Sequence, residues 1–250
     1  MGNVVPELLR SSDPRGAFRA NRLLADVRDD EPAQQRRRGL IATSDNARRL
    51  LELRSTDTHA YRKWQGPHFT LAGLAELGYP PGDPGLRPVF EQVCAWLFSS
   101  RHLQPPHTAV IAGQLDRVRR CASQEGLAIW YSLELGLADG RVEELVQRLL
   151  SFQWPDGGWN CDKRPSARTS SVQETLLPLR GLVRFARELP SAELLSAIDR
   201  AAEFLLARRL LWRQHDGAPI RPHWGPAGAT RPNPFITIDA TWVLGRTSQV

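Results

Sequence analysis

A helical unit that occurs more than once along the chain constrains the fold more than any other feature of the sequence. Residues 73–78 (GLAELG) match residues 131–136 (YSLELG), and each match ends in a glycine that suits the left-handed position closing a helix. An aspartate follows each match and introduces a second amphipathic segment, at residues 84–99 and 140–152. The same second-helix pattern returns after Ser191. The sequence therefore predicts an all-α chain built from helix-turn-helix repeats.

The two helices of a unit differ in polarity, and this difference predicts how they pack. Residues 122–135 and 171–189 are apolar around much of the helix, whereas residues 84–99 and 140–152 carry charges along one face. We therefore expect the first helix of each unit in an inner layer and the second in an outer layer. Pro178 should remove one backbone hydrogen bond and kink its inner helix. The side chains expected to be buried are Leu127, Trp130, Leu133, Leu176 and Leu179.

Length and composition favour a folded protein of the cytoplasm. A chain of 250 residues that is 41% hydrophobic can bury a substantial core. It has no apolar run long enough to span a membrane, and it does not begin with the pattern of a secretory signal. The cysteines Cys94, Cys121 and Cys161 are widely spaced and odd in number, which fits reduced thiols better than a disulfide framework. We expect a cytoplasmic protein without a transmembrane segment.

The charge balance is basic but only weakly clustered. The chain has 33 basic and 27 acidic residues, which gives a net charge of +6. Residues 36–38 form the tight arginine run, and the acidic residues 29–31 lie just before it, so the excess charge is expected to be a solvated face. We expect no nucleic-acid partner. The alternative is a HEAT-like scaffold that engages nucleic acid through its arginine-rich N-terminal third.

The loop after residues 140–152 suggests which repeat architecture is present. Its sequence QWPDGGW, at residues 153–159, resembles the QW motif of squalene-hopene cyclases and related α/α-barrel proteins. The resemblance continues into residues 171–182, much as prenyltransferase β-subunit repeats run from a Gly-Gly turn into an inner helix, and it covers about residues 60–212. In that family the Gln of the motif satisfies backbone groups of the next helix while it stacks on the Trp. The resemblance implies an α/α toroid. A closed ring needs more repeats than this chain supplies, so the toroid is expected to be open, shortened or completed by a partner.

Three segments are expected along the chain. Residues 1–58 form a helical, HEAT-like N-terminal extension, and residues 59–212 hold the α/α-barrel repeats. Residues 213–250 form a tail rich in proline and glycine, with one candidate helix at residues 236–245.

The catalytic motifs of the two enzyme classes do not match this sequence. Triterpene cyclases use DxDD, and the aspartates at residues 26–30 have another spacing. Prenyltransferases hold zinc with Asp, Cys and His, but Ser171 and Gln173 stand where the Asp and Cys would be. We therefore expect no metal and no cofactor. The alternative is a metal site assembled from side chains at the starts of inner helices, namely Cys121, Cys161, Asp162 and His68.

Candidate site residues lie at the starts or on the apolar faces of the predicted inner helices, where an α/α barrel encloses its cavity. The candidate catalytic carboxylates are Glu125, Asp162 and Glu174, because a carboxylate on an inner helix is costly to bury without a partner or a purpose. The candidate pocket residues are Trp64, His68, Gln124, Trp130 and Tyr131. The alternative for each aromatic residue is core packing.

Three classes of function agree with these features. The resemblance implies a prenyltransferase-like or squalene-cyclase-like repeat protein with a hydrophobic cavity for a polyprenyl or other lipid-like substrate. The unmatched catalytic motifs favour, as an alternative, a non-catalytic helical repeat module that binds a lipid or protein partner. The HEAT-like nucleic-acid binder is the third class.

Overall fold

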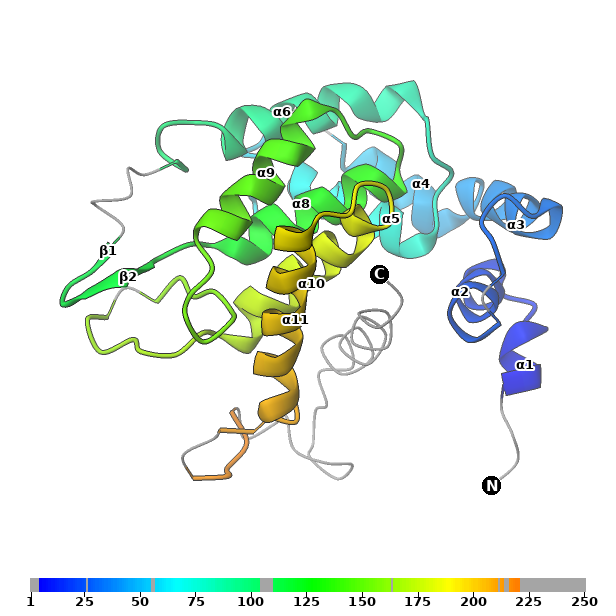
Figure 1. The fold of residues 1–250 in the computed structure, drawn as a ribbon. Helices are drawn as coiled ribbons and strands as arrows, with labels where there is room; N and C mark the ends of the chain where they lie inside the picture. Colours follow the sequence, from blue (N-terminus) through cyan, green and yellow to red (C-terminus); the bar gives the residue numbers. More distant parts are fainter. Residues whose placement is uncertain are drawn as a thin grey trace. The chain divides into compact units, whose positions relative to one another are not determined.

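The computed structural model describes residues 5–25, 27–54, 57–103, 110–162, 164–210, 212–213 and 216–220 (Figure 1). These residues are mostly helical, as the sequence predicts, and they include one two-stranded sheet. No helix in the described ranges is long and apolar enough to cross a membrane. The helix expected at residues 236–245 lies outside the described residues.

The chain divides into two compact units. The first contains the residues up to His102 together with Tyr131–Asp139, and the second contains Leu103–Trp130 and the residues from Gly140 onwards. Helix α8 (Ala122–Glu134) therefore contributes to both units. The three-segment division at residues 58 and 212 that the sequence suggests stays a prediction.

The first unit consists of short helices that follow one another closely. They are α1 (Val5–Leu9), α2 (Pro14–Leu24), α3 (Pro32–Ala42), α4 (Asp45–Glu52), α5 (Pro67–Leu77), the 3-10 helix η1 (Pro84–Leu86) and α6 (Arg87–Leu97). The Asp13 carboxylate accepts hydrogen bonds from the backbone N–H groups of Arg15 and Gly16, which starts α2. Gly78 ends α5 in the left-handed conformation (φ 82°) that the repeat match predicts.

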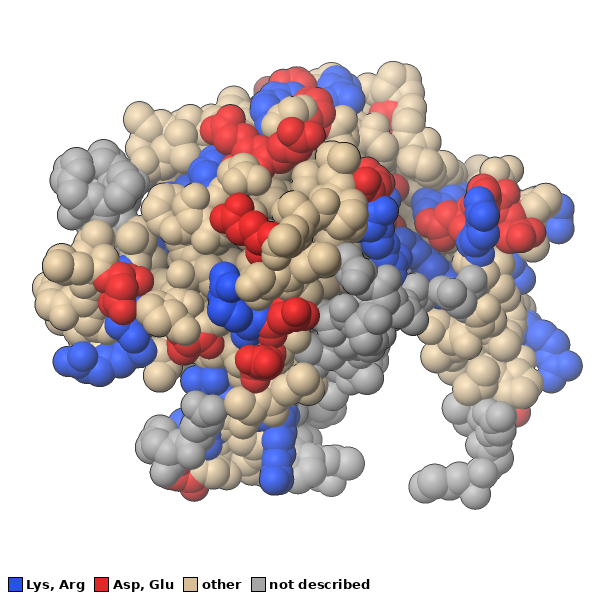
Figure 2. Space-filling model, viewed as in Figure 1, with Lys and Arg blue, Asp and Glu red and all other residues tan. Residues whose placement is uncertain are grey.

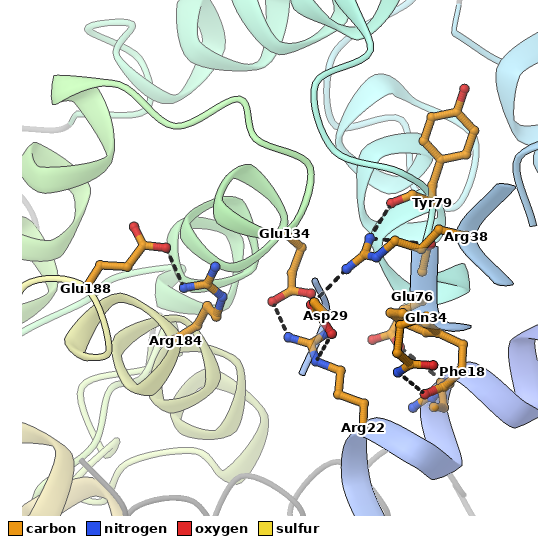
Figure 3. A network of polar contacts seen from close by, with 12 residues as sticks. Phe18, Arg22, Asp29, Gln34, Arg38, Glu76, Tyr79, Glu134, Arg184 and Glu188 are labelled. Carbon is orange, nitrogen blue, oxygen red and sulfur yellow. Dashed lines mark hydrogen bonds and ion pairs between the residues drawn. The ribbon is translucent and has the colours of Figure 1, made fainter. Parts of the chain in front are cut away.

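A network of ion pairs ties distant segments of the first unit together (Figure 3). The Arg22 guanidinium donates to both carboxylate oxygens of the nearly fully buried Glu134, at 2.5 and 2.8 Å. Asp29 lies 3.5 Å from Arg22 and 2.9 Å from Arg38, and Arg38 also donates to the backbone oxygen of Tyr79 at 2.8 Å. Buried pairs of this kind are costly to break from one side. Asp29, which belongs to the aspartates at residues 26–30, is thus part of a structural network.

The described residues of the second unit form a β-hairpin, most of α8 and three further helices. Its other elements are β1 (Val110–Ile111), β2 (Gln114–Val118), α9 (Gly140–Ser151), α10 (Val172–Ala186) and α11 (Ala192–Ala207). The hairpin, in which β1 and β2 pair antiparallel, was not predicted from the sequence. The Gln114 side chain donates to the backbone oxygens of Pro165 and Ala167, at 3.1 and 2.8 Å, and holds the hairpin against the loop before α10.

Burial along the helices agrees only in part with the expected inner and outer faces. Trp130, Leu176 and Leu179 are buried as predicted. The prediction is wrong for Leu127 and Leu133, which keep partial exposure while the polar residues Glu125 and Ser132 of the same helix are fully buried. In α9, which the sequence predicts to be an outer helix, Glu143 and Glu144 are exposed, but the side chain of Arg148 is only 10% exposed. Figure 2 shows basic and acidic side chains intermingled on one face of the molecule.

The backbones of helices α8 and α10 are in direct contact. A Cβ atom on Gly126 would lie 2.3 Å from the Cα of Pro178, and a Cβ on Gly181 would lie 2.5 Å from the backbone oxygen of Gly126. Helix α10 continues on both sides of Pro178, so this residue does not end the helix. Only glycine fits at positions 126 and 181 in this packing.

The turn at residues 153–159 joins three helices of the second unit. The Gln153 amide donates to the backbone oxygen of Gly157 and to that of Ala197 in α11, both at 2.8 Å. The Trp159 indole is fully buried and donates to the backbone oxygen of Leu149 in α9 at 2.9 Å. The backbone oxygen of Trp159 accepts from the N–H of Ser171, which caps α10. Gln153 thus contacts the backbone of α11, and not that of α10, which is the next helix along the chain.

Substitution of Gly126 tests the close approach of α8 and α10. The added methyl group of Gly126→Ala overlaps the backbone of Pro178, so the free energy of unfolding should fall by about 1–3 kcal/mol. The matched control is Gly39→Ala in α3, where no heavy atom lies within 4 Å of the added carbon. Because alanine favours a helix interior, the control should gain about 0.5–1 kcal/mol. Chemical denaturation measures both changes, and equal changes would contradict the packing.

Candidate functional site

Glu125 lies in the first turn of α8 and is fully buried. Its carboxylate accepts hydrogen bonds from Arg120 at 2.8 Å and from Arg148 of α9 at 3.3 Å. Both guanidinium groups are themselves largely removed from solvent. Glu125 therefore compensates buried positive charge in the second unit.

Glu174 lies in the first turn of α10 and caps the neighbouring helix α8. Its carboxylate accepts from the backbone N–H of Ser123 at 2.8 Å and from the Ser123 hydroxyl at 3.0 Å. The Cys161 thiol donates to the same carboxylate at 3.5 Å. Burial raises the pKa of Glu174, and the hydrogen bonds from Ser123 oppose that rise. Helices α8 and α10 are thus tied together at their first turns.

Asp162 is the most exposed of the three predicted carboxylates. It accepts from the backbone N–H of Arg164 at 3.0 Å and pairs with the Arg164 guanidinium at 2.6 Å. A cavity of about 490 Å³ in the first unit is lined by other residues, Arg48, Leu51, Glu52 and Arg54. The catalytic role of Glu125, Asp162 and Glu174 stays a prediction, and each of these carboxylates is engaged by partners from its own unit.

Three of the five predicted pocket residues come together in the first unit. Nδ1 of His68 lies 3.2 Å from the hydroxyl of Tyr131, and the Trp64 ring lies 5.1 Å from that of Phe69, which in turn contacts His68. Tyr61 stacks on Trp96 at 5.2 Å beside them. These rings and two further histidines form what we call the aromatic cluster: His59, Tyr61, Trp64, His68, Phe69, Trp96, His102 and Tyr131.

The aromatic cluster has a buried side and an exposed side. Burial lowers the pKa of His68 to about 3, with a smaller contribution from His102, so its imidazole is neutral at physiological pH. Tyr131 is also fully buried, and its pKa is raised for the same reason. Trp64, by contrast, is 73% exposed. The cluster therefore anchors one solvent-facing indole on a rigid apolar base.

The other two predicted pocket residues belong to the second unit. Trp130 is buried, and the Arg180 guanidinium lies 3.5 Å from its ring centroid, a cation–π contact. Gln124 is partly exposed, and its backbone N–H donates to the oxygen of Cys121 at 3.0 Å at the start of α8. Trp130 thus has the contacts of a core residue.

Sequence reasoning only partly anticipated which groups meet. Cys121 and Cys161 do come together, with Glu174 as their neighbour. Among the described residues, however, no group of three or more His, Cys, Asp or Glu side chains is arranged to hold a metal ion. The sequence did not identify Tyr61, Phe69 and Trp96 as members of the aromatic cluster. The only sequence feature that could have indicated them is that their side chains are aromatic.

Comparison with protein-family models, with curated proteins and with solved structures finds no match to this chain. Two clusters of side chains, one in each unit, are the candidates for a functional site. The aromatic cluster presents an exposed indole, and the second unit presents two thiols beside a buried carboxylate.

The buried imidazole of His68 makes the stability of the protein depend on pH. Because its pKa is lowered from 6.5 to about 3 in the folded protein, the unfolded chain binds this proton first as the pH falls. The stability that the neutral imidazole provides is fully present above pH 6.5. As the pH falls from 6.5 to about 3, the free energy of unfolding should decrease by on the order of 4 kcal/mol. His68→Gln removes the titration, so urea denaturation should show a shallower pH dependence for the variant. Identical pH profiles would contradict this assignment.

Proposed function

We propose that this chain is a non-catalytic helical repeat module, similar to prenyltransferase and squalene cyclase repeats, that binds the surface of anionic lipid membranes in the cytoplasm. The proposal includes the arrangement of its helices as part of an α/α toroid. The backbone contact at Gly126 and the joining of three helices by Gln153 and Trp159 support that arrangement.

The exposed indole of Trp64 is the observation on which the binding function rests. Its side chain is 73% exposed, and its backbone has a positive φ of 65°, which a bulky residue rarely adopts. Such strain persists only where the surroundings impose it, and it is concentrated at functional sites. The Phe69 ring supports the indole at 5.1 Å. The turn therefore holds a large apolar group in the solvent at a conformational cost.

The neighbours of Trp64 indicate the chemistry of the partner. Arg62 and Lys63 are both exposed, and the Lys63 amine lies 5.8 Å from the indole ring. Tryptophan favours the boundary between headgroups and acyl chains, and each nearby cation adds about 1 kcal/mol of attraction to an anionic leaflet. An aromatic side chain flanked by two cations fits this boundary better than it fits a neutral apolar pocket.

The contacts of the predicted catalytic carboxylates also support binding over catalysis. A general acid or base must reach the reacting group of a substrate. Glu125 instead lies between two buried arginines, and Glu174 caps α8 through Ser123. Releasing Glu125 for chemistry would leave two buried guanidinium groups without this partner.

Co-sedimentation with vesicles tests the proposed function. The protein should bind vesicles of phosphatidylcholine with phosphatidylserine, bind pure phosphatidylcholine weakly, and lose binding as salt is added. Trp64→Ala should weaken binding about tenfold or more, because the indole no longer enters the interface. Lys63→Ala should weaken it about fivefold.

Matched variants separate this site from general effects of charge and hydrophobicity. Leu40→Ala removes an apolar side chain that is 60% exposed on α3, and Arg36→Ala removes an exposed cation from the same helix. Both controls should keep most of the binding. Equal losses in the controls and in Trp64→Ala, or no binding of the unaltered protein to the anionic vesicles, would contradict the proposal.

A further inference from the structure

Two thiols of the second unit lie side by side although 40 residues separate them in the sequence. The backbone N–H of Arg120 donates to the oxygen of Asn160 at 2.8 Å, and a cysteine follows each of these residues. The two thiols are close enough for each to shift the pKa of the other. The Cys161 thiol also faces the Glu174 carboxylate, 3.5 Å away. The backbone hydrogen bond between Arg120 and Asn160 therefore brings the two cysteines together.

The surroundings make the two thiols chemically different. Cys121 is exposed and directly precedes α8, whose helix dipole favours a thiolate at this end. The neighbouring Cys161 thiol lowers the pKa of Cys121, and Arg120 acts in the same direction. Cys161 is less exposed, and the neighbouring Cys121 together with burial raises its pKa. One thiol is thus suited to attack and the other to remain protonated until it is needed.

We propose that Cys121 and Cys161 form a dithiol site that hydroperoxides oxidise to a disulfide. The Cys121 thiolate attacks the terminal peroxide oxygen, the O–O bond breaks, and the leaving alkoxide takes a proton to become an alcohol. The resulting sulfenic acid is then attacked by the sulfur of Cys161, which expels the hydroxyl group as water. Two thiols are oxidised to one disulfide, and the hydroperoxide is reduced to an alcohol and water.

Glu174 is placed to assist the second step. Its carboxylate oxygen accepts the hydrogen bond from the Cys161 thiol, and this proton must leave as Cys161 attacks. Burial raises the pKa of Glu174, which helps the carboxylate to hold that proton. Glu174→Gln keeps an oxygen acceptor for Ser123 but removes the base. In this variant disulfide formation should slow while oxidation of Cys121 does not.

Mass spectrometry of the full chain after treatment with hydrogen peroxide tests the proposal. Free thiols are alkylated after unfolding, so that the buried Cys94 serves as an internal control. The result expected is the loss of two hydrogens per chain, a cross-linked pair of peptides containing Cys121 and Cys161, and an alkylated Cys94. Oxidation of Cys121 to a sulfinic acid without the cross-link, or disulfides between chains in its place, would overturn the proposal. So would three alkylated thiols after treatment.

Single substitutions separate the two steps. Cys161→Ser should leave a sulfenic acid at Cys121 that dimedone labels, whereas Cys121→Ser should leave Cys161 unlabelled at the same peroxide concentration. Both variants replace sulfur by oxygen at partly exposed positions, and circular dichroism checks that each is folded. Equal labelling of the two cysteines would contradict the assigned order of attack.

Discussion

The backbone contact between α8 and α10 at Gly126 is the constraint on which the arrangement of the second unit depends. Because a methyl group has no room there, the two helices meet at glycine and proline rather than through large side chains. Their first turns are consequently close enough for Glu174 to cap α8 through Ser123. The same proximity places Cys161, which follows the turn at residues 153–159, beside the start of α8. The contact between α8 and α10 thus places the two thiols next to each other and next to Glu174.

The packing of the second unit removes the carboxylates of Glu125 and Glu174 from water. A carboxylate removed from water costs several kcal/mol unless cations and hydrogen bonds replace the water. Glu125 receives both from Arg120 and Arg148. Glu174 instead relies on the N–H and O–H donors of Ser123, and burial raises its pKa. The two carboxylates therefore differ in role: one balances buried charge, and the other is available as a proton acceptor for Cys161.

Much of the fold follows from the sequence because helices leave local signals. The glycine at position 78, the caps and the apolar periodicity predict the helices, and the motif at residues 153–159 predicts a contact of Gln153 with a helix backbone, although not with which helix. Non-local pairing leaves no such signal. Leu127 was expected in the core and Glu125 at a cavity, because periodicity does not reveal that Arg120 and Arg148 converge on one carboxylate. The short hairpin before α8 was missed for the same reason, since its strands are held by pairing and by Gln114.

Glu125 stabilises the fold, whereas function lies in the exposed indole of Trp64 and in the two thiols beside Glu174. The free energy of unfolding of Glu125→Gln tests this claim most directly, because the substitution keeps the shape of the side chain and removes its charge. A loss of about 3–5 kcal/mol is expected, since Arg120 and Arg148 lose the buried carboxylate that they share. Catalytic residues are often held at a cost to stability. Unchanged or increased stability of Glu125→Gln would therefore contradict the account and return Glu125 to the candidates for catalysis.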